Sequence, residues 1–283
     1  MKVIKTVEEM QNWSETVQLR GETVGLVPTM GYFHQGHLGL METAKAMCDH
    51  LVVSLFVNPT QFGENEDLDA YPMDLDRDFK LAEEKGASVV FAPQREEIYP
   101  AGFQTSVALA SLPLHLCGLN RPVHFGGVAT VVTKLFNIVR PEVAVFGAKD
   151  FQQLQVIRQL VKDLNFNIRI VGNPIVREAD GLAMSSRNVY LSPGERASGL
   201  SLSRSLELAE GLIKEGEKDA AILRAKVTDL ILGFDHTAID YVTLCDPETL
   251  ADVDHVTGPV LVALAVKVGT TRLIDNRVID PAQ

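Results

Sequence analysis

Strand-like and helix-like segments alternate through about the first 170 residues, and this alternation constrains the fold more than any other feature of the chain. Runs typical of buried strands occupy residues 23–28, 51–57, 88–92, 143–146 and 167–171. Segments typical of helices lie between them, at residues 37–49, 74–85, 128–139 and 150–164. The run 51–57 (LVVSLFV) is nearly all apolar, as expected of a strand with helices on both faces. The pattern predicts a Rossmann-like, doubly wound parallel sheet.

The pattern changes near Pro174. A long helix is expected from Pro193 to Gly216, with Ser192 as its N-cap. A second helix and three β-rich runs follow, the latter at residues 238–244, 260–268 and 271–278. We therefore expect a Rossmann-like domain at residues 1–174 and a smaller α+β domain at residues 175–283.

Composition excludes several classes of protein. The net charge of −11 does not suit non-specific binding to nucleic acid or to a membrane surface, which needs a basic face. The three cysteines are far apart and predict neither a disulfide framework nor a metal site. The N-terminus lacks the apolar stretch of a signal peptide, and no apolar run approaches the roughly 20 residues of a membrane span. A soluble, cytoplasmic protein is expected, which can bind a polyanion only through a local cluster of donors.

The segment PTMGYFHQGH (residues 28–37) lies between the first strand and the first helix of the alternating region. At this point of a doubly wound fold the free N–H groups of the helix face the ligand crevice and attract phosphate. His34 and His37 are three residues apart and can project to one side, and Gly36 lets a ligand approach the backbone. We interpret the segment as a nucleotide site, with surface histidines or a metal pair as the alternatives.

Two other segments supply cations and hydroxyls. Lys149, in GAKD (residues 147–150), follows a strand and can neutralise an oxyanion, while Asp150 can accept from ribose hydroxyls or cap the next helix. Ser185, Ser186 and Arg187 form a compact grip for phosphate, because a guanidinium presents a planar fork to phosphate oxygens. Their place on the smaller domain suggests a lid that closes on the outer phosphates. The alternatives are an ordinary helix cap and a polar turn.

Neutral amides follow two of the strands. Gln61 lies in NPTQF (residues 58–62), and Gln152 and Gln153 follow Asp150. Amides can hold the oxygens of a small hydroxy acid without a salt bridge that would weaken a carboxylate nucleophile. Buried structural glutamines explain the same pattern equally well.

Seven blocks together resemble the pantothenate synthetase (pantoate–β-alanine ligase) family, within the superfamily of nucleotidylyltransferases that carry a HIGH motif. They are PTMGYFHQGH, LFVNPTQF, DAYP, RPVHFGGV, FGAKDFQQL, DGLAMSSRN and RLIDN, in this order over residues 28–276. The resemblance implies that pantoate attacks the α-phosphate of MgATP to give pantoyl adenylate and pyrophosphate. β-Alanine then displaces AMP to give pantothenate. It also implies a homodimer.

The resemblance also implies roles for single residues. His37 would be the proton donor, His34 would assist at the phosphates, and Lys149 would lie at the α-phosphate. Gln61 would contact pantoate and then β-alanine, and Gln153 would contact pantoate. Val176 would offer backbone to adenine, and Arg187 would grip the outer phosphates. The residues assigned to ATP are Met30, Gly31, Tyr32, Phe33, His34, Gln35, Gly36, His37, Gly147, Ala148, Lys149, Asp150, Val176, Met184, Ser185, Ser186 and Arg187.

Three positions depart from the family's usual pattern. Ala148 replaces the acidic residue of GEKD, Cys117 replaces the acidic residue of LEG, and Met73 replaces the arginine of YPR. None of them removes a residue assigned to phosphate chemistry. Three rival functions remain open: a nucleotidylyltransferase with a stable adenylylated product, a nucleotide sensor without activity, and a metal-binding module built on His34 and His37.

Overall fold

The computed structural model describes residues 1–63, 68 and 71–282. Residues 69 and 70, the first half of the DAYP block, lie outside this range. The described chain divides into two compact units. The first comprises Met1–Pro113, Arg121–Ala148 and Gln153–Pro174, and the second comprises Leu114–Asn120, Lys149–Gln152 and Ile175–Gln283. The two short segments of the second unit, residues 114–120 and 149–152, fall within the domain expected at residues 1–174.

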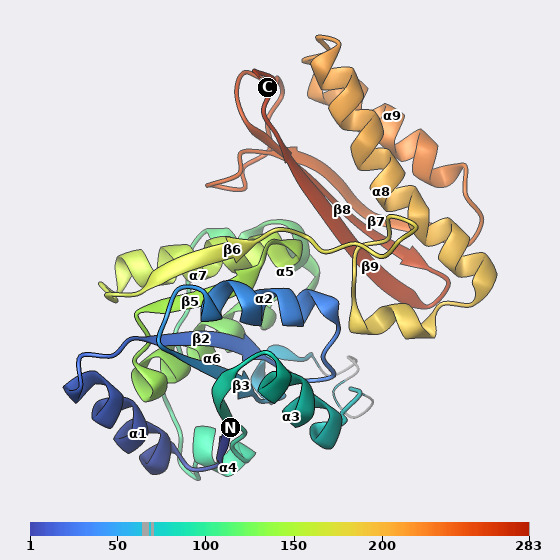
Figure 1. The fold of residues 1–283 in the computed structure, drawn as a ribbon. Helices are drawn as coiled ribbons and strands as arrows, with labels where there is room; N and C mark the ends of the chain where they lie inside the picture. Colours follow the sequence, from blue (N-terminus) through green and yellow to red (C-terminus); the bar gives the residue numbers. More distant parts are fainter. Residues whose placement is uncertain (64–67, 69–70, 283) are drawn as a thin grey trace. The chain divides into compact units, whose positions relative to one another are not determined.

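A six-stranded parallel sheet forms the centre of the first unit (Figure 1). Its strands follow the order β1-β4-β3-β2-β5-β6. The prediction of a doubly wound, Rossmann-like sheet is confirmed. The strands are β1 (Lys2–Ile4), β2 (Val24–Thr29), β3 (His50–Leu55), β4 (Ala87–Phe91), β5 (Val143–Gly147) and β6 (Arg169–Asn173).

Apolar side chains cover both faces of this sheet. Val52 faces one core cluster, whereas its neighbours Leu51 and Val53 face the other, and all three are fully buried. Helices α1 (Val7–Leu19), α6 (His124–Val139) and α7 (Phe151–Asp163) contribute to the first cluster. Helices α2 (Gln35–Lys45) and α3 (Leu75–Glu84) contribute to the second. Shorter elements are η1 (Pro59–Gln61), α4 (Arg95–Ile98) and η2 (Leu112–Leu114).

The strand order reverses between β2 and β5, which are neighbours in the sheet. From β2 the chain moves outward to β3 and β4, and from β5 it moves the other way to β6. Ligands of open α/β sheets bind outside the carboxyl ends of the strands at such a switch point. The residues that follow β2 and β5 are therefore the first place to look for a site.

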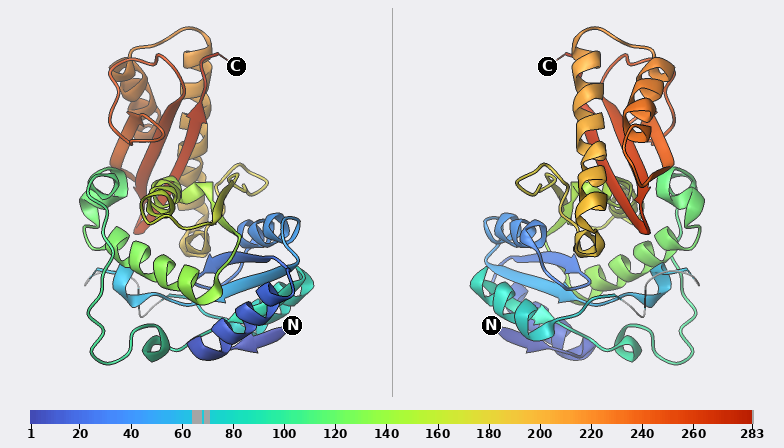
Figure 2. Two further views of the ribbon diagram at one scale, coloured as in Figure 1. Left: turned by 90° about the vertical axis from the view of Figure 1, so that its left-hand side faces the viewer. Right: turned by 90° about the vertical axis from the view of Figure 1, so that its right-hand side faces the viewer.

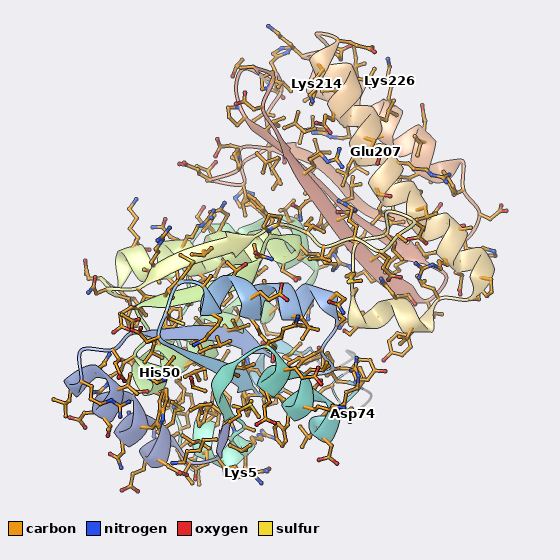
Figure 3. All side chains as sticks on the ribbon, in the orientation of Figure 1. Lys5, His50, Asp74, Glu207, Lys214 and Lys226 are labelled. Carbon is orange, nitrogen blue, oxygen red and sulfur yellow. The ribbon has the colours of Figure 1, made fainter. Side chains whose placement is uncertain are left out.

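The second unit has an antiparallel sheet of β7 (Thr237–Cys245), β8 (Val260–Val268) and β9 (Thr271–Ile279). Helices α8 (Pro193–Lys214) and α9 (Ala220–Leu232) pack against it, and Figure 2 shows α8 running alongside the strands. Ser192 caps α8 as predicted, and Glu195 completes a capping box. The exposed Glu207, Lys214 and Lys226 lie on α8 and α9 (Figure 3). The unit also holds α5 (Leu116–Asn120), η3 (Ala148–Asp150, from Lys149 on) and η4 (Ser186–Tyr190).

Several elements were not predicted from the sequence, among them β1, α1 and the short helices α4 and α5. Two helices begin earlier than expected. Helix α2 begins at Gln35 because His34 caps it, and α6 begins at His124 because its two glycines do not interrupt it. Among the described residues, no helix combines the length and the hydropathy that crossing a membrane requires.

Candidate active site

The loop between β2 and α2 turns sharply at the switch point. Gly31 has φ of 93° and Tyr32 has φ of 53°, so two successive residues adopt the left-handed region. This conformation is strained for tyrosine and needs support from neighbouring groups. The chain then reaches His34, which is extended (φ −127°) and forms the N-cap of α2.

His34 and His37 form a capping box at the start of α2. The Gly36 backbone N–H donates to Nδ1 of His34 (3.1 Å), and the His34 backbone N–H donates to Nδ1 of His37 (3.3 Å). The ring centroids are 4.1 Å apart. Since each Nδ1 is an acceptor, each neutral imidazole carries its proton on Nε2. In this form each ring can donate from Nε2, which suits an anion bound at a helix N-terminus.

Gly36 is needed for the histidine arrangement itself. A Cβ at this position would lie 2.7 Å from Cε1 and 2.8 Å from Nδ1 of His34. The His34 ring therefore packs directly over the backbone of Gly36. From the sequence, Gly36 was expected to let a ligand approach the backbone. The packing of the His34 ring is a second reason for a glycine at this position.

Asp78, on α3, holds the loop that precedes the histidines. Its Oδ2 accepts from the backbone N–H of Tyr32 (2.6 Å), and its Oδ1 accepts from that of Phe33 (2.8 Å). Burial raises the pKa of this carboxyl, against the lowering effect of the two N–H donors. Arg77 adds a bond to the carbonyl of Phe33 (2.9 Å) and lies over the Tyr32 ring. Neither residue could be assigned to the loop from the sequence, because both are more than forty positions from it.

Gln61 lies buried in η1, and both ends of its side-chain amide are engaged. Its Oε1 accepts from Nδ2 of Asn58 (3.1 Å), and its Nε2 donates to Sδ of Met30 (3.2 Å). The second bond connects the proposed acid-binding residue to the proposed ATP-binding loop. Burial raises the pKa of Tyr99, whose hydroxyl donates to Oδ1 of Asn58 (2.8 Å).

Helix α6 packs closely against Gln61. A Cβ on Gly127 would lie 2.4 Å from the carbonyl oxygen of Thr60, so only glycine permits this approach. His124 Nδ1 lies 3.0 Å from the carbonyl oxygen of Gln61, and Nη2 of Arg121 lies 3.5 Å from the same oxygen. Both residues belong to the RPVHFGGV block (residues 121–128), whose role was not predicted from the sequence. They bring a guanidinium and an imidazole beside the backbone carbonyl of Gln61.

The turn after β5 carries Lys149 and Asp150. Gly147 ends the strand, and the two residues lie in η3, immediately before α7. The side-chain Nδ2 of Asn276 donates to the carbonyl oxygen of Lys149 (2.8 Å). Lys149 is half-buried, whereas Asp150 is exposed.

The two adjacent glutamines differ in their environment. Gln152 is buried, its Nε2 donates to the carbonyl of His115 (2.6 Å), and its Oε1 accepts from the N–H of Cys117 (3.0 Å). It therefore has the structural role that was the alternative explanation. Gln153 is half-buried on α7 and remains the candidate for pantoate.

Residues 176–184 form a hairpin, and η4 follows it. The N–H of Met184 donates to the carbonyl of Val176 (2.9 Å), and Gly181 makes the turn with φ of 97°. Ser185 is the N-cap of η4, and its Oγ accepts from the N–H of Arg187 (3.3 Å). Ser185, Ser186 and Arg187, for which a phosphate-binding role was predicted, thus lie at the start of a 3-10 helical turn, and Arg187 is half-buried.

Cys117, at the position where the family usually has an acidic residue, lies beside Arg272 and Tyr241. Its Sγ is 3.3 Å from the Tyr241 hydroxyl and 3.6 Å from Nη2 of Arg272. Arg272 pairs with Asp240 (2.7 Å), so its charge is balanced without a carboxylate at position 117. The departure therefore leaves no unpaired guanidinium. Met73 is exposed, and nothing in the structure explains its presence.

Within the described residues, no group of three or more His, Cys, Asp or Glu side chains could hold a metal ion. A resident metal at His34 and His37 would also need their Nδ1 or Nε2 atoms. Both Nδ1 atoms accept backbone N–H bonds instead.

Comparison with known proteins gives a consistent result. A family model described as pantoate-beta-alanine ligase matches residues 2–278. The pantothenate synthetase of Desulforapulum autotrophicum is 70% identical over 283 residues, which are 100% of both chains. A pantothenate synthetase structure from Thermus thermophilus is 43% identical with a TM-score of 0.92, over 98% of this chain and 99% of that chain.

A second solved structure is of a complex with ligands. It is a pantoate-beta-alanine ligase from Francisella tularensis, complexed with beta-gamma ATP and beta-alanine. It is 30% identical with a TM-score of 0.81, over 98% of this chain and 97% of that chain. From the matching model, the near relative and the shared fold, it follows that the chain belongs to the pantoate–β-alanine ligase family.

Proposed function

We propose that the protein joins pantoate to β-alanine at the expense of ATP, through a pantoyl-adenylate intermediate. The observation that carries the proposal is the histidine capping box at the switch point, where two imidazoles whose Nδ1 atoms accept backbone N–H bonds lie at a helix N-terminus. Family membership and the ligands of the Francisella tularensis ligase support it.

The chemistry explains why ATP is needed. A carboxylic acid with a pKa near 4 is an anion at neutral pH and resists attack by an amine. In the first step a carboxylate oxygen of pantoate attacks the α-phosphorus, and the bond to the β-phosphate breaks to release pyrophosphate. In the second step the β-alanine amine attacks the acyl carbon, the acyl–oxygen bond breaks, and AMP leaves.

Residues from the loop after β2 and from three later segments would stabilise the first step. Nε2 of His37 would donate a proton to the phosphates, with His34 beside it. Lys149 would neutralise charge at the α-phosphate, and Arg187 would bind the outer phosphates. Transfer at phosphorus depends mainly on such preorganised charge and position. The remaining ATP contacts would come from the other residues at positions 30–37, 147–150, 176 and 184–187.

Gln61 and Gln153 would position the acid. The bonds from Asn58 to Gln61 and from Gln61 to Met30 fix the orientation of the first amide. Gln61 would release the weak sulfur acceptor and donate to pantoate, and later to β-alanine. The half-buried Gln153 would bind pantoate from α7.

Several wider features belong to the same proposal. Mg²⁺ would enter with ATP as part of the substrate. Residues 1–174 would bind ATP and pantoate, and residues 175–283 would act as a lid. The protein would work in the cytoplasm as a homodimer, with no nucleic-acid or membrane partner.

A pyrophosphate-release assay tests the proposal. With MgATP alone the purified protein should release no pyrophosphate. Adding pantoate should give about one equivalent per site, and adding β-alanine should start steady turnover with AMP and pantothenate in equal amounts. Steady turnover with pantoate alone would favour a nucleotidylyltransferase, and ATP binding without any release would favour a sensor.

A further inference from the structure

Two polar residues of the RLIDN block have no part in the proposed reaction, yet both lie buried in the second unit. Asp275 and Asn276 are neighbours on β9, with only 3% and 8% of their surfaces exposed. Burying such side chains is unfavourable unless they are hydrogen-bonded. Their partners therefore indicate what the block does.

Asp275 holds the hairpin that carries the adenine and phosphate residues. Its Oδ2 and Oδ1 accept from Nη1 (2.7 Å) and Nη2 (2.9 Å) of Arg177. This bidentate bond raises the pKa of Arg177. The same Nη1 donates to the carbonyl oxygen of Gly181, at the hairpin turn (3.0 Å). Arg177 directly follows Val176, and the hairpin leads into Met184, so Asp275 binds the hairpin on which both residues lie.

Asn276 holds the turn that carries Lys149. Its Nδ2 donates to the carbonyl oxygen of Lys149 (2.8 Å). Its own backbone N–H donates to Oδ1 of Asp275 (2.8 Å), which links the two contacts. All of these residues belong to the second unit. One dipeptide thus contacts two segments that are separated by more than twenty residues of sequence.

We propose that Asp275 and Asn276 are positioning residues for ATP, which set the Lys149 turn and the Val176–Arg187 segment in one fixed arrangement. The inference rests on the proposed function. Asn276 acts through the backbone of Lys149, and Asp275 acts through Arg177.

A double-mutant cycle distinguishes positioning from a general effect on folding. Asn276→Ala should lower the rate of pantoate-dependent pyrophosphate release in a single turnover by about 10- to 100-fold, because small misplacements of a catalytic group are costly. Lys149→Ala removes the ammonium but keeps the carbonyl that Asn276 binds. In that background Asn276→Ala has no ammonium to displace, so the double variant should be about as slow as Lys149→Ala alone.

A structural role would give a different result. If Asn276→Ala lowered the rate by the same factor with and without Lys149, or did not lower it at all, the inference would be wrong. Asp229→Asn, an exposed carboxylate on α9 of the same unit, is the matched control and should keep the wild-type rate. Should the alanine variant not fold, Asn276→Asp serves instead, since it keeps the size and removes the donor.

Asp275→Asn tests the other contact, since it keeps the size and removes the charge that binds Arg177. We expect the Michaelis constant for ATP to rise by about tenfold or more, with the Michaelis constant for pantoate unchanged. An unchanged Michaelis constant for ATP would contradict this half of the inference. The activity of the wild-type protein separates the two proposals. If the wild type shows no pantoate-dependent pyrophosphate release, the proposed function is wrong. If it shows normal release but the effects of Asn276→Ala and Lys149→Ala are additive, only the positioning role is wrong.

Discussion

His34 and His37 obtain their chemical character from the backbone around them. The backbone N–H groups of His34, the N-cap, and of Gly36, in the first turn of α2, donate to the Nδ1 atoms and so determine the tautomer of each ring. The spacing of the histidines in the sequence correctly predicted a shared position at a helix start. It could not predict that the rings themselves cap the helix, because histidine is not among the usual N-cap residues. The Asp78 contact was equally hidden, since it depends on tertiary folding.

His37→Ala should reduce turnover by about 10²-fold or more, because it removes a preorganised donor from the phosphate site. It also removes the acceptor for the His34 N–H, so a loss of about 1 kcal/mol in stability is expected. His37→Gln separates the two effects, since glutamine at this position can accept the same N–H bond. Steady-state kinetics and thermal unfolding should show recovered stability without recovered turnover. Near-wild-type turnover in His37→Gln would remove the proposed role.

Asp78→Asn should leave either the Tyr32 or the Phe33 N–H without its acceptor, because an amide offers only one oxygen. An unsatisfied buried donor costs about 1–3 kcal/mol, and the strained loop should then relax away from its active conformation. We expect turnover to fall by about tenfold or more. Asp76→Asn, an exposed carboxylate on the same helix, is the control. Equal kinetics for the two variants would show that Asp78 does not support the site.

At the scale of elements, the strands and helices with strong local signals were predicted well. The run 260–268 coincides with β8, and Ser192 caps α8 as expected. Strand β1 has three residues and too little pattern to detect. Helix α1 could have been found, since Thr6 and Glu9 have the spacing of a capping box and Thr6 does accept the Glu9 N–H. Helix α6 begins within a glycine-containing stretch, where tertiary packing overrides a poor local propensity.

Packing between α6 and η1 gives a prediction at this scale. Gly127→Ala would place a methyl group 2.4 Å from the Thr60 carbonyl oxygen, so the two elements must separate. We expect about 1–3 kcal/mol of destabilisation and a higher Michaelis constant for pantoate, because η1 carries Gln61. Gly126→Ala is the matched control: its added Cβ would meet no atom within 4 Å, and it should stabilise the helix by roughly 0.5–1 kcal/mol. Similar stability and pantoate kinetics in both variants would contradict the close packing.

At the scale of the whole molecule, the sequence predicted a doubly wound sheet and a smaller α+β domain, and the observed fold confirms both. It did not predict that residues 114–120 and 149–152 group with the second unit, because such grouping depends on contacts far apart in the sequence. Lys149 is held there by β9, more than a hundred residues later. We propose one reaction for the protein, in which the carboxylate of pantoate attacks the α-phosphorus of ATP.

Oxygen labelling tests this claim most directly. Pantoate labelled with ¹⁸O in both carboxylate oxygens is incubated with the protein, MgATP and β-alanine, and the products are examined by mass spectrometry. Attack on the α-phosphorus followed by cleavage of the acyl–oxygen bond should transfer one labelled oxygen to each AMP and leave pyrophosphate unlabelled. Unlabelled AMP, or label in inorganic phosphate with formation of ADP, would contradict the adenylate pathway.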